Sequence, residues 1–270
     1  MGKFDGILLC SDYDGTLGIG GKISEENRDA IRYFQENGGL FTLVSGRNPH
    51  LLDQWLTEID LKVNAPLVGY NGALIMDEQT GEILYSGGRQ DLLALELAEQ
   101  LWEHAPETYR VVLHDNTTRS LAIFREGEDT PSRVHSFDEM RSKCIFPLYN
   151  MLCTAKTPEE TEHLLHILQE LSPDDFEIAR SWSKGVEIIC NEDTKGAAAK
   201  RLKRMLNAKL LVTVGDFEND ISMLEAGDIS YAVENALPHV KAVAKRQTVH
   251  YEQSAIAAIV AELERDLRTV

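Results

Sequence analysis

The chain has 270 residues, 43% of them hydrophobic, so it can bury one large core or two smaller ones. Its 27 basic and 44 acidic residues leave a formal charge of −17, which argues against nucleic acid as a partner because the phosphates would be repelled. The four cysteines form no Cys-x-x-Cys pair, so neither a zinc site nor a disulfide framework is indicated.

The sequence shows no pattern typical of a targeting signal or a membrane span. The chain does not open on a basic stretch followed by an apolar one, and it contains no apolar run of about 18 residues. We therefore expect a reduced, soluble, cytoplasmic protein without a membrane partner.

The first third of the chain alternates between strand and helix patterns. Gly6–Cys10 is an apolar run typical of a strand buried on both faces. Ser24 is placed to cap a helix that stops near Gly38. Two further strands are predicted at Leu40–Val44 and around Leu67–Val68.

The last third repeats this alternation. Its predicted elements are, in chain order, a helix, a strand, a helix, a strand and a terminal helix: Thr194–Leu206, Leu210–Val214, Asn219–Ala226, Ile229–Val233 and Ser254–Leu267. Short apolar strands between helices predict an α/β fold with a doubly wound, mainly parallel sheet.

The middle of the chain has a different pattern. Five segments there resemble strands: Val111–His114, Leu121–Phe124, Met151–Thr154, Glu177–Arg180 and Val186–Cys190. Only two helices are predicted beside them, at Asp91–His104 and Pro158–Leu171. We therefore predict an α+β insertion over residues 84–190 in an α/β core formed by residues 1–83 and 191–270.

The clearest chemical motif is Asp12-Tyr13-Asp14-Gly15-Thr16, directly after the first buried strand. Ligands of open parallel sheets bind beyond the carboxyl ends of the strands, where these carboxylates are expected. One carboxylate can serve a divalent cation and the chemistry while the other transfers protons. A solvated Asp-Gly turn is the simplest alternative; a calcium loop of the EF-hand type fails, because Thr16, Leu17 and Ile23 occupy positions that need other residues.

A second acidic motif, Gly215-Asp216-Phe217-Glu218-Asn219-Asp220, also follows a predicted strand and opens a helix. Carboxylates crowded at a strand end are unfavourable unless a cation compensates them, and hard oxygen ligands suit Mg²⁺. An ordinary acidic helix start would explain Asn219 and Asp220, but it does not explain Asp216.

Three weaker signals lie at similar places. Ser45-Gly46-Arg47 follows the second strand and could cradle a phosphate with its hydroxyl and backbone N–H groups. Lys195-Gly196 opens a helix, although most lysines are simply solvated. Asn71-Gly72 is more typical of a turn than of a site.

Taken together, these motifs resemble those of the haloacid dehalogenase-like phosphatases, in particular the Cof-type branch with a large α+β cap of the C2 type. The matching strings are DYDGTL (Asp12–Leu17), VSGR (Val44–Arg47), NGA (Asn71–Ala73), TKG (Thr194–Gly196) and GDFENDISML (Gly215–Leu224). Their order and spacing cover nearly the whole chain outside the expected cap.

The resemblance implies roles for particular residues. Asp12 would attack phosphorus, and Asp14 would protonate the leaving oxygen and then activate water. A Mg²⁺ cofactor would be held by Asp12, the carbonyl of Asp14 and Asp216, with Asp220 nearby or acting through water. The phosphoryl oxygens would be held by four residues: Ser45, Gly46, Lys195 and Asn219. Ion-pumping relatives have threonine at the position of Asp14, so aspartate here favours rapid hydrolysis.

Two segments depart from the family pattern. The family tends to have Ala-Met-x-Asn-Ala where this chain has Ala232-Val233-Glu234-Asn235-Ala236, and residues 250–254 are also atypical. These departures concern the floor of the expected pocket rather than the chemistry.

The function expected from the sequence is a Mg²⁺-dependent phosphoric monoester hydrolase whose partner is a small phosphorylated metabolite, such as a sugar phosphate or a phosphorylated cofactor, with the chain a monomer or homodimer. One alternative is a phosphomutase of the phosphomannomutase type, which would need a second anion site among the arginines of the insertion: Arg110, Arg119, Arg125, Arg133, Arg141 and Arg180. The other is a catalytically idle regulator, whose signature would be a missing motif aspartate; none is missing.

Overall fold

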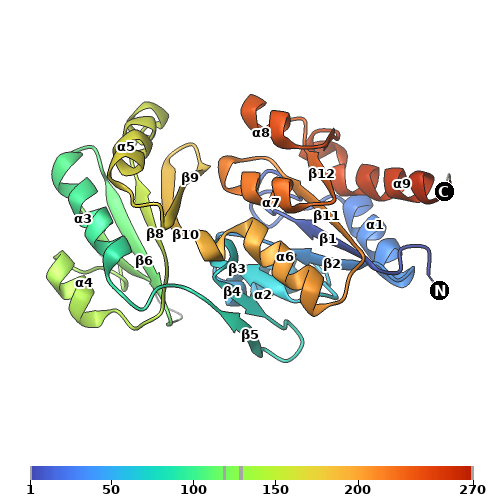
Figure 1. Ribbon diagram of the computed structural model, residues 1–270, viewed down its shortest axis with the longest axis horizontal. Helices are drawn as coiled ribbons and strands as arrows, with labels where there is room; N and C mark the ends of the chain where they lie inside the picture. The colour runs from blue at the N-terminus through green and yellow to red at the C-terminus, as the bar shows by residue number, and fades with distance from the viewer. Residues whose placement is uncertain (1, 118–119, 128–129, 269–270) are drawn as a thin grey trace. The chain divides into compact units, whose positions relative to one another are not determined.

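The computed structural model describes residues 2–117, 120–127 and 130–268. The chain divides into two compact units. The first combines Met1–Tyr85 with Lys195–Val270, and the second is Ser86–Thr194 (Figure 1).

A parallel sheet forms the centre of the first unit. Its strands stand in the order β13-β12-β11-β1-β2, and their bounds are Arg246–Gln247, Ile229–Ala232, Leu210–Gly215, Ile7–Ser11 and Leu40–Leu43. Every neighbouring pair in this sheet is parallel. The strands β1 and β11 lie side by side although about 200 residues of chain separate them, in a register that pairs Ser11 with Val214.

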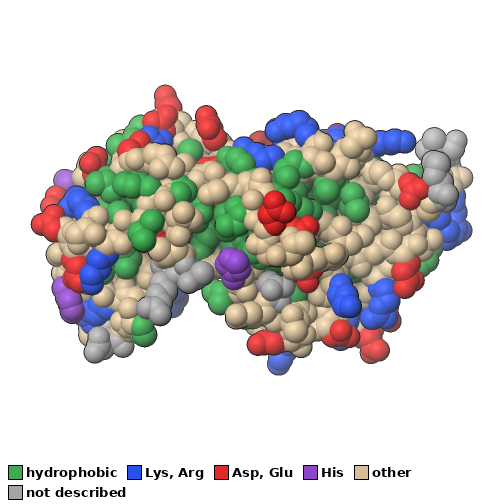
Figure 2. Space-filling model, turned by 90° about the horizontal axis from the view of Figure 1, so that it is seen from below, with side chains coloured by type: hydrophobic (Ala, Val, Ile, Leu, Met, Phe, Trp, Pro, Cys, Tyr) green, Lys and Arg blue, Asp and Glu red, His purple; other side chains and the backbone are tan. Residues whose placement is uncertain are grey.

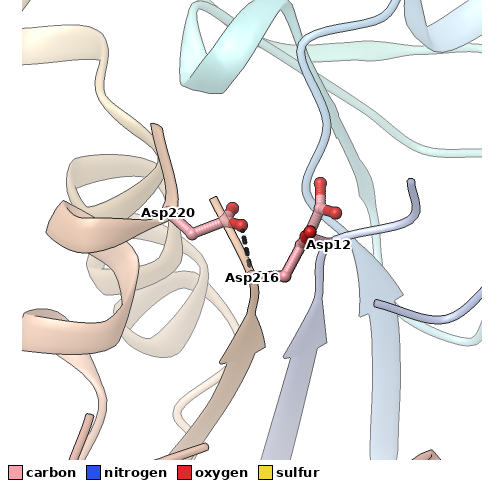
Figure 3. A group of neighbouring side chains, drawn as sticks. All are labelled: Asp12, Asp216 and Asp220. Carbon is pink, nitrogen blue, oxygen red and sulfur yellow. Dashed lines mark hydrogen bonds between the residues drawn. The ribbon is translucent and has the colours of Figure 1, made fainter. Parts of the chain in front are cut away.

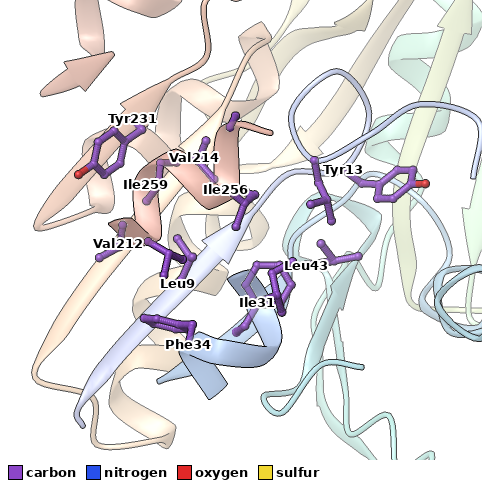
Figure 4. Close-up of a cluster of buried hydrophobic side chains, with 14 of the residues drawn as sticks. Leu9, Tyr13, Ile31, Phe34, Leu43, Val212, Val214, Tyr231, Ile256 and Ile259 are labelled. Atoms are coloured by element: carbon purple, nitrogen blue, oxygen red, sulfur yellow. The ribbon is translucent and has the colours of Figure 1, made fainter. Parts of the chain in front are cut away.

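Helices cover both faces of this sheet. On one face, α1 (Glu25–Glu36) and α9 (Ala255–Arg268) enclose a core with side chains such as Leu9 and Val212 (Figure 4). On the other face, α6 (Lys195–Met205) and α7 (Ile221–Ala226) pack against Leu8 and Leu211. The side chains of adjacent strand residues therefore pack into the two cores on opposite faces of the sheet, as expected for a strand buried on both faces. The predicted doubly wound α/β fold is confirmed.

Other elements of this unit were not expected from the sequence. Helix α2 (Pro49–Glu58) begins with a proline after the capping residue Asn48, and α8 (Pro238–Val243) also begins with a proline. The third predicted strand, β3 (Leu67–Gly69), joins a separate sheet in the order β3-β4-β5 with β4 (Leu74–Met76) and β5 (Ile83–Ser86). The β3–β4 pair is antiparallel because the chain reverses through a short 3₁₀ turn, Tyr70–Gly72. Two more 3₁₀ turns of this unit occupy Glu218–Asp220 and Tyr251–Gln253, and another, Asn191–Asp193, belongs to the second unit.

The second unit is an α+β layer structure. Its antiparallel sheet has the order β7-β6-β8-β10-β9, with bounds Leu121–Phe124, Arg110–Asp115, Leu148–Thr154, Gly185–Cys190 and Phe176–Trp182. One face packs on α3 (Leu93–His104), α4 (Phe137–Lys143) and α5 (Pro158–Leu171). The short helix α4 was not predicted, so the expectation of only two helices here was wrong.

The charged surface is mixed. Figure 2 shows acidic and basic side chains interspersed on the face that it presents. Among the described residues, none of the helices has the length and apolar composition needed to cross a membrane.

Candidate active site

The sheet brings the two acidic motifs together. Asp12 follows β1 and Asp216 follows β11. Because these strands are parallel neighbours, their carboxyl ends meet at the same edge, and the Asp12 N–H donates to the Val214 carbonyl at 3.0 Å. Figure 3 shows the side chains of Asp12, Asp216 and Asp220 gathered at these strand ends.

Three buried carboxylates converge there. Asp12, Asp216 and Asp220 are 6%, 8% and 0% exposed, and one oxygen atom from each lies within 4.8 Å of the others. Asp220 also caps the turn in which it lies, since its Oδ2 accepts from the N–H groups of Asp216 and Phe217 at 2.9 and 3.1 Å.

A buried lysine, Lys195, contacts this cluster. Its Nζ donates to Asp12 Oδ1 at 2.8 Å and to Asp220 Oδ1 at 2.7 Å, and the side chain is only 1% exposed. Burial acts to lower the pKa of Lys195, but attraction from Asp12 and Asp220 outweighs it and leaves the pKa above its ordinary value. The lysine is therefore charged at neutral pH.

One ammonium group does not balance three carboxylates. Burial raises the pKa of Asp12 from 3.8 to about 7, despite the attraction of Lys195. Burial, together with repulsion from Asp12 and Asp220, raises the pKa of Asp216 to about 8. If all three carboxylates are ionised, the cluster with Lys195 has two surplus negative charges.

The donor set fits a hard dication. Carboxylate oxygens are preferred ligands of Mg²⁺, and two positive charges would balance the surplus of the cluster. The cluster formed by Asp12, Asp216 and Asp220 could therefore hold a metal ion.

The backbone around the cluster is closely packed. Gly15 has φ +85°, and a Cβ atom there would lie 2.5 Å from Asp216 Oδ2. Thr16 donates from its hydroxyl to Asp216 Oδ1 at 2.9 Å. Gly15 therefore meets both a conformational and a steric requirement.

The Asp14 side chain lies outside this cluster. Its carboxylate is bound in bidentate fashion by Arg47, at 2.8 Å from Nε and 3.0 Å from Nη2, and is 42% exposed. Of the two Asp14 groups, the backbone carbonyl was expected to bind the metal and the carboxylate to transfer protons. An exposed carboxylate outside the cluster is compatible with that division.

The predicted phosphate-binding residues come from several elements of the same unit. Ser45 follows β2, is 2% exposed and accepts at its carbonyl from the Asn71 N–H at 2.9 Å. Asn219 donates from Nδ2 to Asn71 Oδ1 at 3.1 Å. Gly46, beside Ser45, is partly exposed.

Asn71 was expected only to form a turn. It does lie in a 3₁₀ turn, with φ 57°, but its side chain is fully buried and orients Asn219. Its contact with a residue 148 positions away could not be read from the local Asn-Gly signal.

Three residues that were not predicted from the sequence also contribute to the site: Thr16, Arg47 and Asn235. Thr16 and Arg47 lie within the motifs DYDGTL and VSGR, but nothing in the local pattern indicates their contacts. Asn235 lies in the atypical segment after β12 and donates to the Gly15 carbonyl at 2.7 Å while accepting from the Tyr251 N–H at 3.2 Å. Both atypical segments thus support the loop after Asp14.

Comparison with known proteins identifies the family. A sequence model of the haloacid dehalogenase-like hydrolases matches residues 9–260, and the chain belongs to this family. The predicted family and the assignment to a hydrolytic enzyme are confirmed.

Several relatives match over almost their whole length. The chain is 25% identical to the putative phosphatase YxeH of Bacillus subtilis, covering 95% of this chain and 97% of the relative. It is 26% identical to the pyridoxal phosphate phosphatase YbhA of Escherichia coli, covering 87% and 90%. A solved haloacid dehalogenase-like hydrolase from B. subtilis superposes with a TM-score of 0.80 at 22% identity, covering 95% of this chain and 99% of the other. The subclass IIB sugar phosphatase BT4131 superposes with a TM-score of 0.76 at 21% identity, covering 94% and 98%.

Proposed function

We propose that this protein is a Mg²⁺-dependent phosphatase that hydrolyses small phosphorylated metabolites through an aspartyl-phosphate on Asp12. The observation that carries the proposal is the convergence of the Asp12, Asp216 and Asp220 carboxylates, with Lys195 bound to two of them. The proposal is also supported by the names of the relatives, which describe phosphatases.

Asp12 has the chemistry of the nucleophile. One of its oxygens would form a bond to phosphorus while the bond to the leaving oxygen breaks. Lys195 holds Oδ1 at 2.8 Å, which fixes the carboxylate and restricts its rotation. Mg²⁺ at Asp12, Asp216 and the Asp14 carbonyl, with Asp220 nearby, would offset the repulsion between carboxylate and phosphoryl group.

Asp14 is suited to transfer protons because its carboxylate is exposed and stands outside the acidic cluster. It would give a proton to the leaving oxygen, and then take one from the water that attacks phosphorus, breaks the bond to Asp12 and releases phosphate. Ser45, Gly46, Lys195 and Asn219 would hold the phosphoryl oxygens.

The substrate class rests on the relatives and on the second unit. One relative is named for pyridoxal phosphate, so pyridoxal 5′-phosphate and hexose phosphates are the first compounds to test. We assign substrate selection to residues 86–194, the unit inserted into the catalytic fold.

A phosphomutase is less well supported. It would need free arginines for a second phosphate, yet three of the six candidates bind other groups of the protein. Arg125 donates to the carbonyls of Trp102, Ala105 and Thr108. Arg141 pairs with Glu99 and Asp138, and Arg180 pairs with Glu162. Arg119 lies outside the described residues.

The test is phosphate release from a panel of metabolite phosphoesters, with Mg²⁺ and with EDTA. We expect release only with Mg²⁺, and a loss of at least about 10³-fold in Asp12→Asn, since the nucleophile is removed. Asp29→Asn, at an exposed carboxylate in α1, is the matched control. Equal release by wild type and Asp12→Asn would refute the proposal, and isomer conversion without net phosphate release would favour the mutase.

A further inference from the structure

The guanidinium group of Arg47 is held between a carboxylate and an aromatic ring. On one side it forms the bidentate ion pair with Asp14, through Nε at 2.8 Å and Nη2 at 3.0 Å. On the other side its Cζ lies 4.2 Å from the centre of the Trp55 ring. The Trp55 ring in turn packs on Tyr13 with a centroid separation of 5.7 Å.

This arrangement contributes little to stability. The side chains of Arg47 and Asp14 are 40% and 42% exposed, and exposed ion pairs are weak because water screens them. A bidentate contact nevertheless fixes the plane of a carboxylate, which a single lysine contact does not. The stacking on Trp55 fixes the plane of the guanidinium itself.

The chain path explains how Arg47 reaches Asp14. Asp14 lies just beyond β1 and Arg47 just beyond β2, and these strands are parallel neighbours with Ser11 beside Leu43. Trp55 comes from α2, which starts two residues after Arg47. The segment from β2 to α2 therefore supplies both the guanidinium that binds Asp14 and the ring that packs on that guanidinium.

We infer that Arg47, stacked on Trp55, is a positioning residue that orients the Asp14 carboxylate toward the leaving oxygen. The inference rests on the proposed function, in which Asp14 protonates that oxygen. Proton transfer depends first on geometry, and a partly exposed aspartate without a partner would rotate freely. Arg47 thus acts through Asp14 and has no contact with Asp12 or Asp216 in the described hydrogen bonds.

The test compares two esters with leaving groups of similar size and different basicity. Phenolate is more basic than p-nitrophenolate, so phenyl phosphate depends more strongly on a proton donor than p-nitrophenyl phosphate does. The quantity to measure is kcat/KM with Mg²⁺, because it reports the steps up to departure of the leaving group. For Arg47→Gln we expect a loss for phenyl phosphate about tenfold greater than that for p-nitrophenyl phosphate.

Two further variants separate positioning from charge and from folding. Arg47→Lys keeps the charge but not the planar fork, so it should retain the unequal loss. Arg32→Gln, at an exposed arginine paired with Asp29, should leave both esters unaffected. All variants should unfold at the same urea concentration as the wild type to within the error of the measurement.

The outcomes distinguish this inference from the proposed function. Equal losses for the two esters, or full recovery in Arg47→Lys, would overturn the positioning role and leave Arg47 as a charge that attracts the phosphate. A wild type that releases phosphate from neither ester, or an Asp12→Asn variant as active as the wild type, would instead contradict the proposed function.

Discussion

The crowded carboxylates make a specific stability effect measurable in the metal-free protein. Asp216 is 8% exposed, and burial with repulsion from Asp12 and Asp220 raises its pKa from 3.8 to about 8. A carboxyl group with a raised folded-state pKa stabilises the fold below its unfolded pKa, and this contribution is lost as the pH rises through the folded value. Replacing Asp216 by Asn removes the charge and keeps an oxygen that can accept from Thr16.

The size of the effect follows from the shift. About four pKa units at about 1.4 kcal/mol each give an upper value of about 6 kcal/mol above pH 8. Part of the repulsion is relieved when Asp12 takes up a proton instead, so we expect Asp216→Asn to gain on the order of 3 kcal/mol. The gain should grow as the pH rises from about 4 to about 8.

The assay is urea unfolding in EDTA at about pH 5 and about pH 8.5, followed by circular dichroism. Asp29→Asn, at an exposed carboxylate, should change the free energy of unfolding by less than about 0.5 kcal/mol at either pH. If Asp216→Asn is less stable than the wild type at the higher pH, or if its gain does not vary with pH, the reasoning from buried, crowded charge is wrong.

Three other expectations concern the same site. Mg²⁺ should raise the free energy of unfolding of the wild type, more at about pH 8.5 than at about pH 5 because ligand carboxylates must lose their protons, as urea titrations with and without the ion would show. Lys195→Met should lower the rate of phosphate release at least about 10²-fold and destabilise the fold by about 3–5 kcal/mol at neutral pH, because it leaves buried carboxylates without their cation. The control is Lys200→Met, at an exposed position on α6, and an equally large effect there would contradict the prediction. Gly15→Ala should lower the midpoint of thermal unfolding more than Gly21→Ala does. Both glycines have positive φ, but only at Gly15 would a Cβ atom lie 2.5 Å from Asp216 Oδ2. Equal midpoints for the two variants would show that this close approach is relieved at no cost.

Local patterns explain why much of the fold could be predicted. Apolar runs such as the one at β1 identify buried strands, and the predicted cap Ser24 accepts from the Asn27 N–H at 3.1 Å at the start of α1. Helix α4 and the strands β4 and β5 were missed because they are short, and a short segment offers too few residues to establish a period. The antiparallel course of β3–β4 depends on the turn at Asn71 rather than on the strand residues.

Which residue types stand at the strand ends can be predicted from the amino-acid sequence, because each motif is local: an acid after β1, an acid after β11 and a lysine opening α6. Which of these side chains contact one another depends on the folded arrangement of the strands. Lys195 reaches Asp12 across 183 positions of chain, and the carboxylate of Asp14 turns to Arg47 instead of joining Asp216. Such contacts depend on strand order and side-chain direction, which arise from packing the whole sheet between its helices and have no signature in the neighbouring residues.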